Sequence, residues 1–186
     1  MVEKHNQLFD YVNRKYGDDT TVIDSSKTLE ALEAVEKALF DQPDPSSLHI
    51  VFTCKDVRGF AMSIMRKQQT MSLLGIARAF NWWVAVNKQW LSYLQDQPHP
   101  YSINLYEFLC ASPDTLIRHV TSSDAGNQRP GVSHIAMGNK KFALRNRDHL
   151  TYDDEWRLNW RIKLVYRLHF AARALNKRIY QTAFKD

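Results

Sequence analysis

The segment HIVFTCKDVRGFAMSIMRK, from His49 to Lys67, decides how the chain can fold. Its first six residues are apolar or β-branched at nearly every position, which is typical of a strand buried on both faces of a parallel sheet. The polar, basic residues KDVRG follow at once and lead into a helix-forming stretch. We therefore expect a fully buried strand at 49–54 that feeds directly into a helix, and this is the building block of α/β proteins.

Two other segments extend this pattern. TTVID, Thr20 to Asp24, is a short β-branched run, and SSKTLEALEAVEKALF, residues 25–40, opens with capping residues and repeats Leu and Ala at helical spacing. YSINLYEFL, residues 101–109, is a third candidate strand. Strands that alternate with helices predict an α/β fold in which helices flank a parallel sheet.

Helical periodicity predicts further helices. The first spans Val2 to Tyr16, with Gly17 at its C-cap, and a long one spans Met71 to Asp96. A short helix is expected in ASPDTLIRHV, with Pro113 in its first turn. Three tryptophans of the long helix are expected to be core aromatics, and these are Trp82, Trp83 and Trp90.

A terminal helix is predicted from about Asp153 to Phe184, with arginine and lysine between its apolar positions. The apolar positions at helical spacing are Leu158, Ile162, Val165, Leu168, Ala172 and Leu175. We expect this helix to pack on its own domain with a charged outer face. Contact with an anionic membrane or with nucleic acid is the alternative.

Composition narrows the class of protein. The chain has 186 residues, 44% of them hydrophobic, which suffices for one core and predicts a single domain. A net charge of +5 favours anionic partners. Cys54 and Cys110 are too few for a disulfide framework and lack zinc-site spacing, and no HExxH pair occurs, so we expect no metal. Without an apolar leader or spanning segment, the chain as it stands is expected to be cytoplasmic.

Basic residues follow two of the predicted strands: Lys27 in DSSK, and Lys55 with Arg58 in KDVRG. The carboxyl ends of parallel strands face helix N-termini, whose free N–H groups and positive dipole end favour anions. The pattern therefore predicts a phosphate site, with solvated surface charges as the alternative. Cys54, at the end of the buried strand, is expected to be an inert core thiol.

At this point the sequence resembles a known family. VIDSSKTLEAL followed by HIVFTCKDVRGFAMS is similar to the central part of sulfotransferases that use 3′-phosphoadenosine 5′-phosphosulfate (PAPS), in which a DSSK-like strand end precedes an RDPRG-x-x-x-S segment. INLYEFLCASPDTL resembles the family's arginine-tyrosine-glutamate-aspartate-leucine segment. SHIAMGNKKF and YDDEW are similar to its late histidine, glycine-asparagine and tryptophan elements. These segments occur in the family's order.

The resemblance implies roles for individual residues. Lys55 and Ser63 would bind the 3′-phosphate of the cofactor, although a lysine ammonium lacks the bidentate fork of the family's arginine. Lys27 would stabilise charge on the leaving phosphate oxygen and is the catalytic candidate. Tyr106 and Glu107 would support the fold near the site. The expected cofactor-binding residues are Lys55, Arg58, Ser63, Gly138, Asn139, Lys140 and Lys141.

The implied reaction is in-line transfer of a sulfuryl group from PAPS to a hydroxyl or amine acceptor. The acceptor is not identified, and His134 is equally suited to be the base or to order its loop. The family's 5′-phosphosulfate loop is not among the 23 residues before DSSK. We therefore expect residues 1–186 to be one partial domain of a P-loop-NTPase-like sulfotransferase fold that lacks its N-terminal strand. The alternatives are a non-catalytic nucleotide-binding module and a basic nucleic-acid- or membrane-surface-binding protein.

Overall fold

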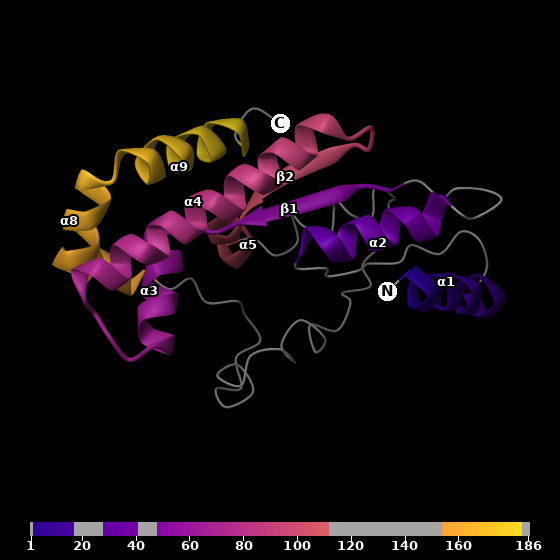
Figure 1. Ribbon diagram of the computed structural model, residues 1–186, viewed down its shortest axis with the longest axis horizontal. Coiled ribbons are helices and arrows are strands. Elements are labelled where there is room, and N and C mark those ends of the chain that lie inside the picture. The colour runs from indigo at the N-terminus through magenta and orange to yellow at the C-terminus, as the bar shows by residue number, and fades with distance from the viewer. Residues whose placement is uncertain (1, 17–27, 41–47, 112–153, 184–186) are drawn as a thin grey trace. The chain divides into compact units, whose positions relative to one another are not determined.

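The computed structural model describes residues 2–16, 28–40, 48–111 and 154–183 (Figure 1). The predicted strand at 20–24, the predicted helix around Pro113 and the GNKKF loop lie outside these ranges. The chain divides into two compact units, Met1–Ile50 with Pro98–Pro100 and Val51–Gln97 with Tyr101–Asp186. The expectation of a single domain therefore stays a prediction.

The first unit contains two helices that pack on each other, α1 (Val2–Tyr16) and α2 (Leu29–Phe40). The predicted bounds of α1 are confirmed. The α2 helix occupies the later part of its predicted range and buries Leu, Ala and Val side chains, namely Leu32, Ala34, Val35 and Ala38. Thr28 precedes this helix, and its hydroxyl accepts a hydrogen bond from the Ala31 N–H at 3.3 Å.

The described part of the chain is mostly helical and contains one small parallel sheet, which is consistent with the general α/β class. The two strands of this sheet are β1 (Ile50–Cys54) and β2 (Tyr101–Leu105). The prediction that β1 is fully buried is wrong, because burial alternates and Thr53 is exposed. One face of the strand is packed: the Phe52 ring stacks on Trp90 with centroids 5.6 Å apart. Side chains of a strand point alternately to its two faces, so one covering layer buries every second residue.

The predicted strand at 101–109 is right for its first five residues only, because the helix α5 (Tyr106–Ala111) begins directly after β2. The α3 helix (Val57–Lys67) follows β1 as predicted, and Asp56 caps its N-terminus. The α4 helix (Leu73–Asp96) begins after the cap residue Ser72, two residues later than predicted.

The α4 helix is packed along one side. Its buried residues recur at helical spacing and are Ile76, Ala79, Phe80, Trp83, Val84, Asn87 and Leu94. Trp83 is 2% exposed, but Trp82 is 54% exposed, so the prediction of Trp82 as a core aromatic is wrong. At about 100° per residue, Trp82 lies outside the arc of α4 that the buried residues occupy, whereas Trp83 lies within it.

The prediction of one continuous terminal helix is also wrong. The chain forms a 3₁₀ turn η3 (Glu155–Leu158) and two helices, α8 (Trp160–Leu168) and α9 (Phe170–Ala183). Asn159 Oδ1 accepts hydrogen bonds from the N–H groups of Arg161 and Ile162, and His169 Nδ1 accepts one from the Ala172 N–H at 3.2 Å. These side chains cap new helices, and such local bonds compete with continuation of the previous helix.

The breaks change which apolar side chains of this region are buried. Four of the six predicted apolar positions are buried, and these are Ile162, Val165, Ala172 and Leu175. Leu158 and Leu168 are instead 90% and 74% exposed. Among the described helices, none has the length and apolar character that crossing a bilayer requires.

Candidate functional site

Lys55 and Ser63, the two residues expected to share a phosphate, are in contact. Lys55 follows the last residue of β1, and its Nζ donates a hydrogen bond to Ser63 Oγ at 2.9 Å. Ser63 lies in the second turn of α3, and its hydroxyl donates to the carbonyl of Gly59 at 3.0 Å. The Lys55 ammonium also lies 5.0 Å from the centroid of the Tyr106 ring, within the range of a cation–π interaction. The structure therefore brings one cation and one hydroxyl together beside the carboxyl end of β1.

Gly59 makes this contact sterically accessible. A Cβ atom at Gly59 would lie 3.1 Å from Lys55 Cε and 3.8 Å from Trp156 Cδ1. The Lys55 side chain therefore runs closely over the first turn of α3 on its way to Ser63. A side chain at position 59 would push the ammonium away from this path.

Arg58, also expected to bind the cofactor, has a different set of partners. Its Nε and Nη2 donate to the two carboxylate oxygens of Asp56 at 2.8 and 2.7 Å. The guanidinium carbon lies 3.9 Å from the centroid of Trp156 and 4.7 Å from that of Tyr166. These contacts anchor η3 and α8 to the start of α3, so Arg58 has a structural function whether or not it also binds a ligand.

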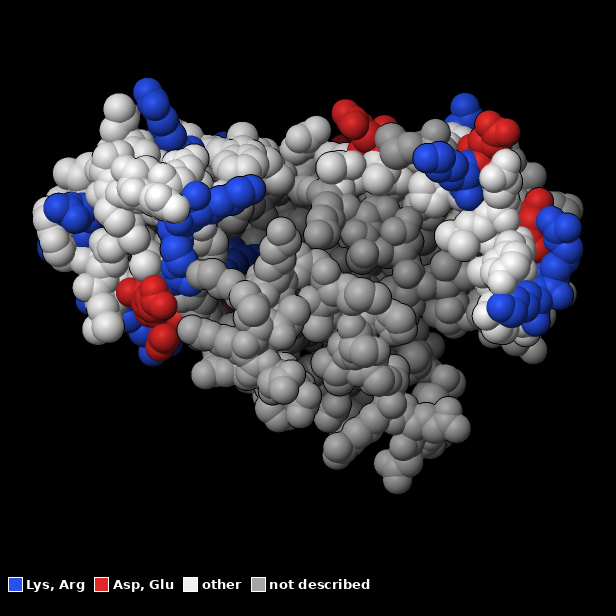
Figure 2. Space-filling view, turned by 90° about the horizontal axis from the view of Figure 1, so that it is seen from below, with Lys and Arg blue, Asp and Glu red and all other residues white. Residues whose placement is uncertain are grey.

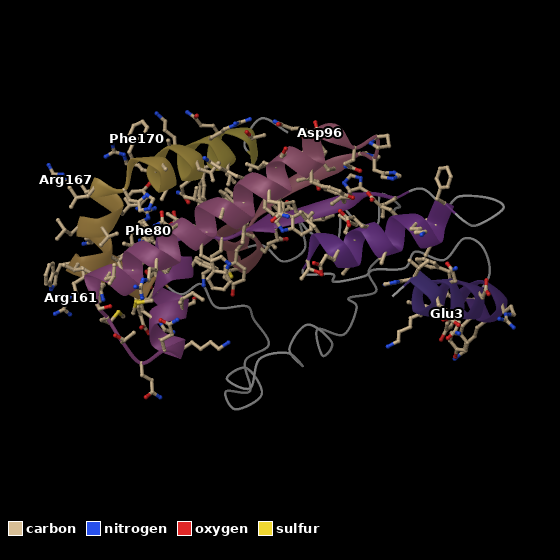
Figure 3. All side chains as sticks on the ribbon, in the orientation of Figure 1. Glu3, Phe80, Asp96, Arg161, Arg167 and Phe170 are labelled. Atoms are coloured by element: carbon tan, nitrogen blue, oxygen red, sulfur yellow. The ribbon has the colours of Figure 1, made fainter. Side chains whose placement is uncertain are left out.

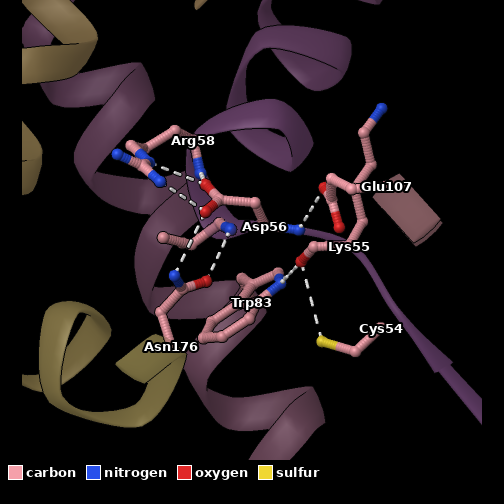
Figure 4. A network of polar contacts seen from close by, with 8 residues as sticks. Cys54, Lys55, Asp56, Arg58, Trp83, Glu107 and Asn176 are labelled. Carbon is pink, nitrogen blue, oxygen red and sulfur yellow. Dashed lines mark hydrogen bonds and ion pairs between the residues drawn. The ribbon is translucent and has the colours of Figure 1, made fainter. Parts of the chain in front are cut away.

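We call residues Cys54–Arg58 the junction, and hydrogen bonds from three other elements hold its backbone (Figure 4). Trp83 Nε1 of α4 donates to the Lys55 carbonyl at 2.9 Å, and Glu107 Oε1 of α5 accepts from the Asp56 N–H at 3.0 Å. Asn176 of α9 accepts from the Val57 N–H at 3.0 Å and donates to Asp56 Oδ2 at 3.2 Å. The position of the Lys55 backbone is thus fixed from several sides.

These bonds correct one expectation about the start of α3. We expected free N–H groups there for an anion, but the N–H of Val57 is bonded to Asn176 and that of Arg58 to Asp56 Oδ1 at 2.8 Å. Asp56 also places a carboxylate at this end of the helix. An anion at the junction would therefore depend on the side chains of Lys55 and Ser63 rather than on these two backbone groups.

Cys54 has the properties of the inert core thiol that the sequence predicts. It is 3% exposed, and its Sγ lies 3.1 Å from Asn87 Oδ1, to which the thiol donates. Burial raises the pKa of Cys54, and the carboxylates of Glu107 and Asp56 raise it further. A thiol that resists ionisation is a poor nucleophile.

A cavity of about 430 Å³ opens beside the junction. Its lining combines acidic, basic and aromatic side chains, which are Asp56, Arg58, Glu107, Phe108, Trp156, Arg157, Lys163 and Tyr180. Glu107 Oε2 is buried, and within the described ranges it has no hydrogen-bond partner. A ligand or water with a donor group could therefore satisfy this oxygen.

The remaining predicted site residues belong to segments that the structure does not describe. Lys27, His134 and the loop residues Gly138, Asn139, Lys140 and Lys141 all lie outside the described residues. Within the parts of the chain that the structure describes, no three His, Cys, Asp or Glu side chains are grouped as a metal site requires.

Sequence reasoning missed three residues of the junction network: Asp56, Trp83 as a donor, and Asn176. Asp56 could have been found, because aspartate directly before a helix is a typical N-cap. Asn176 left no such signal, since it lies 120 positions from Asp56 in the chain. Tyr106 contacts Lys55 and Glu107 contacts Asp56, and the supporting function expected of both residues stays a prediction.

Comparisons of the chain with protein-family models, with curated proteins and with solved structures find no match.

Proposed function

We propose that the junction binds the 3′-phosphate of PAPS and that the chain belongs to a PAPS-dependent sulfotransferase with the corresponding fold. The observation that carries the proposal is the 2.9 Å contact between Lys55 Nζ and Ser63 Oγ at the carboxyl end of β1. The place of Lys55 after a strand and the resemblance of the KDVRG segment predicted this pair, and eight positions separate the two residues in the sequence. Their contact supports a shared ligand, because a phosphate needs convergent donors.

The chemistry of the pair suits a phosphate oxygen. An ammonium has three N–H donors, and Ser63 Oγ accepts one of them. The serine hydroxyl now donates to the Gly59 carbonyl, and rotation about its Cβ–Oγ bond could redirect that proton to a phosphate. The Tyr106 ring faces the ammonium and partly desolvates it, which strengthens its attraction for an anion.

The local charges favour Lys55 as the cation for the phosphate. Arg58 is neutralised by the two oxygens of Asp56, which is 2% exposed and forms a bidentate pair with it. In Figure 4 the Lys55 ammonium lies away from the Asp56, Arg58 and Asn176 cluster. A phosphate beside Ser63 would thus meet the Lys55 ammonium and not the Arg58 guanidinium, which Asp56 already binds.

The proposed reaction transfers the sulfuryl group of PAPS to an acceptor hydroxyl or amine. The sulfur–oxygen bond to the 5′-phosphate breaks as a bond to the acceptor forms, and the acceptor proton passes to a base. Lys27 is proposed to stabilise the negative charge that develops on the leaving phosphate oxygen. Lys55 and Ser63 act at the other end of the nucleotide, where they bind and orient the cofactor.

The test compares adenosine 3′,5′-bisphosphate with adenosine 5′-monophosphate by isothermal titration, since the two ligands differ only in the 3′-phosphate. The bisphosphate should bind more tightly, and Lys55→Met should remove this preference. Loss of a charge-assisted hydrogen bond of about 1.5–3 kcal/mol corresponds to roughly 10- to 150-fold in affinity. Ser63→Ala should cause a smaller loss.

Two matched variants sharpen the result. Lys67→Met removes an exposed lysine from the last turn of the same helix and should leave binding unchanged. Lys55→Arg should retain the preference, because a guanidinium also binds phosphate and does so with a bidentate fork. Equal binding of the two nucleotides by the unaltered chain, or full affinity in Lys55→Met, would refute the proposal.

A further inference from the structure

The charged side chains of the segment from Trp156 to Ala183, which contains α8 and α9, are all positive. Residues 156–183 contain five arginines, two lysines and no aspartate or glutamate. The basic residues are Arg157, Arg161, Lys163, Arg167, Arg173, Lys177 and Arg178, and all are exposed. The rest of the chain mixes both signs, so this region is distinct in its electrostatics.

Large apolar side chains are exposed among these cations. Five of them lie in only 13 residues, with exposed fractions of 90% for Leu158, 60% for Trp160, 38% for Leu164, 74% for Leu168 and 72% for Phe170. Single exposed leucines are ordinary in soluble proteins, but a contiguous group that contains two aromatics is a mark of an interaction surface.

Helical geometry places these residues in one stripe. Trp160, Leu164 and Leu168 are four residues apart on α8 and therefore lie on the same side of the helix. Lys163 and Arg167 follow one edge of this stripe, and Arg161 lies at the other edge. We call this surface, with Phe170 at the start of α9, the outer face. Figure 3 shows Arg161, Arg167 and Phe170 projecting outward, whereas Phe80 lies between the helices.

The opposite side of α8 and α9 is already packed. Ile162, Val165 and Leu175 are buried, and the Phe80 ring of α4 lies against Tyr166 and His169 with centroids 6.3 and 5.6 Å apart. His169 Nε2 also lies 3.0 Å from Asn81 Oδ1 of α4. The inner side thus fixes both helices to their unit, and the exposed apolar stripe is not needed for this packing.

We propose that the outer face docks on an anionic lipid bilayer, with Trp160, Leu168 and Phe170 in the headgroup region and the flanking cations on lipid phosphates. A stripe of Trp, Leu and Phe bordered by Arg and Lys is the arrangement of helices that lie in the membrane plane. Tryptophan in particular prefers the level of the headgroups. Arg161 lies over the Trp160 ring at 5.0 Å, so the cation and the ring can enter that layer together.

The cations of the outer face indicate an anionic partner, and its apolar stripe favours a lipid bilayer over nucleic acid as that partner. Seven cations without an acid would attract any polyanion. Nucleic acid could bind the cations through its phosphates and could stack bases on one or two of the aromatic rings. It offers no extended apolar surface, however, to cover exposed leucines such as Leu164 and Leu168. Seen from below in Figure 2, the end where α3 and α8 lie carries blue and white side chains together with a red acidic patch, so the absence of acids is a property of residues 156–183 and not of that whole end.

The test is co-sedimentation of the full chain with phosphatidylcholine vesicles that contain about 30 mol% phosphatidylserine, compared with phosphatidylcholine alone. The chain should sediment only with the anionic vesicles. Arg161→Gln with Arg167→Gln should lower the partition coefficient on the order of 20-fold, because each cation near an anionic surface contributes about fivefold. Leu168→Gln with Phe170→Gln should lower it by tenfold or more, since both side chains are withdrawn from the apolar layer.

Two controls separate this face from general basicity. Lys4→Gln with Lys37→Gln removes two exposed lysines from α1 and α2 and should change the partition coefficient less than twofold. Trp160→Phe retains an aromatic ring, so binding should persist, but quenching of tryptophan fluorescence by brominated lipids should fall. Thermal melting of every variant should match the unaltered chain, because the replaced side chains are exposed.

Three results would overturn the proposal. The first is equal loss of binding in the α1 and α2 control. The second is full vesicle binding by the Leu168→Gln, Phe170→Gln variant together with salt-sensitive binding of single-stranded RNA, which would indicate a purely electrostatic or nucleic-acid surface. The third is absence of vesicle binding together with a dimer in sedimentation velocity that the same variant abolishes, which would make this face a protein interface.

Discussion

Asn176 is the residue whose removal should reveal how the junction is held. Its Oδ1 accepts from the Val57 N–H at 3.0 Å, and its Nδ2 donates to Asp56 Oδ2 at 3.2 Å. Asn176→Ala removes both bonds. Val57 is fully buried, so water cannot replace the lost acceptor, and an unsatisfied buried donor costs about 1–3 kcal/mol.

The second bond adds less to the expected loss. Asp56 retains the bidentate pair with Arg58, and the missing amide donor should therefore cost about 1 kcal/mol. The total is roughly 2–4 kcal/mol in the free energy of unfolding. For a chain of this size that corresponds to a melting temperature lower by roughly 4–16 °C.

Urea denaturation is the assay, with the midpoint expected to fall and the m value to stay constant. Lys177→Ala, an exposed neighbour on α9, is the matched control and should stay within about 0.5 kcal/mol of the unaltered chain. If Asn176→Ala is as stable as Lys177→Ala, the two bonds do not hold α9 to the junction, and the reasoning fails.

Asn176→Asp adds a pH dependence with a defined sign. The new carboxylate would lie beside Asp56, and both burial and the like charge should raise its pKa in the folded state above the usual 3.9 or so. The folded protein then binds more protons than the unfolded chain, so its stability relative to the unaltered chain falls as the pH rises from about 4 towards neutrality. A difference in unfolding free energy that does not grow over this pH range would contradict the expected proximity of the two carboxylates.

Two further predictions concern the junction and its strand. Gly59→Ala should leave the melting temperature within about 2 °C of that of the unaltered chain, since the flexible end of Lys55 can move away from the new Cβ. The same variant should bind adenosine 3′,5′-bisphosphate more weakly, because the Lys55 ammonium is displaced. Unchanged affinity would argue against the close path of the Lys55 side chain over Gly59. The raised pKa of Cys54 predicts that stability is fully present below the usual cysteine pKa of about 8.5 and falls above it, because the unfolded thiol loses its proton first. Urea denaturation between pH 8 and 10 should show a smaller slope in Cys54→Ala, and equal slopes would exclude this thiol as the cause.

The sequence was sufficient for several local elements. An apolar run with β-branched residues predicted β1, and helical periodicity with capping residues predicted α1, α3 and α4. The contact of Lys55 with Ser63 could also be predicted from the sequence. A helix that starts at residue 57 places Ser63 one turn beyond Gly59, on the same side of the helix, where a long side chain from position 55 can contact it. These features depend on residues within about three turns of one another, so local geometry fixes them.

Other features depended on contacts that no local pattern contains. The sequence could not tell that Trp83 faces the junction while Trp82 faces solvent, because both are equally apolar. The elements that pack on α4, which include α3, α8 and α9, distinguish its two sides. Periodicity likewise predicted one terminal helix, whereas the side chains of Asn159 and His169 end one helical segment and cap the next, so that Leu158 and Leu168 are exposed.

The sequence by itself therefore determined the strand and the helix on either side of the junction, β1 and α3, and which cation lies at the carboxyl end of β1. Only the tertiary structure decided what holds that end in place, since Trp83, Glu107 and Asn176 come from three separate elements. The physical reason is that buried backbone N–H and C=O groups must find partners after the chain has packed, and those partners are set by proximity in space and not by position in the sequence.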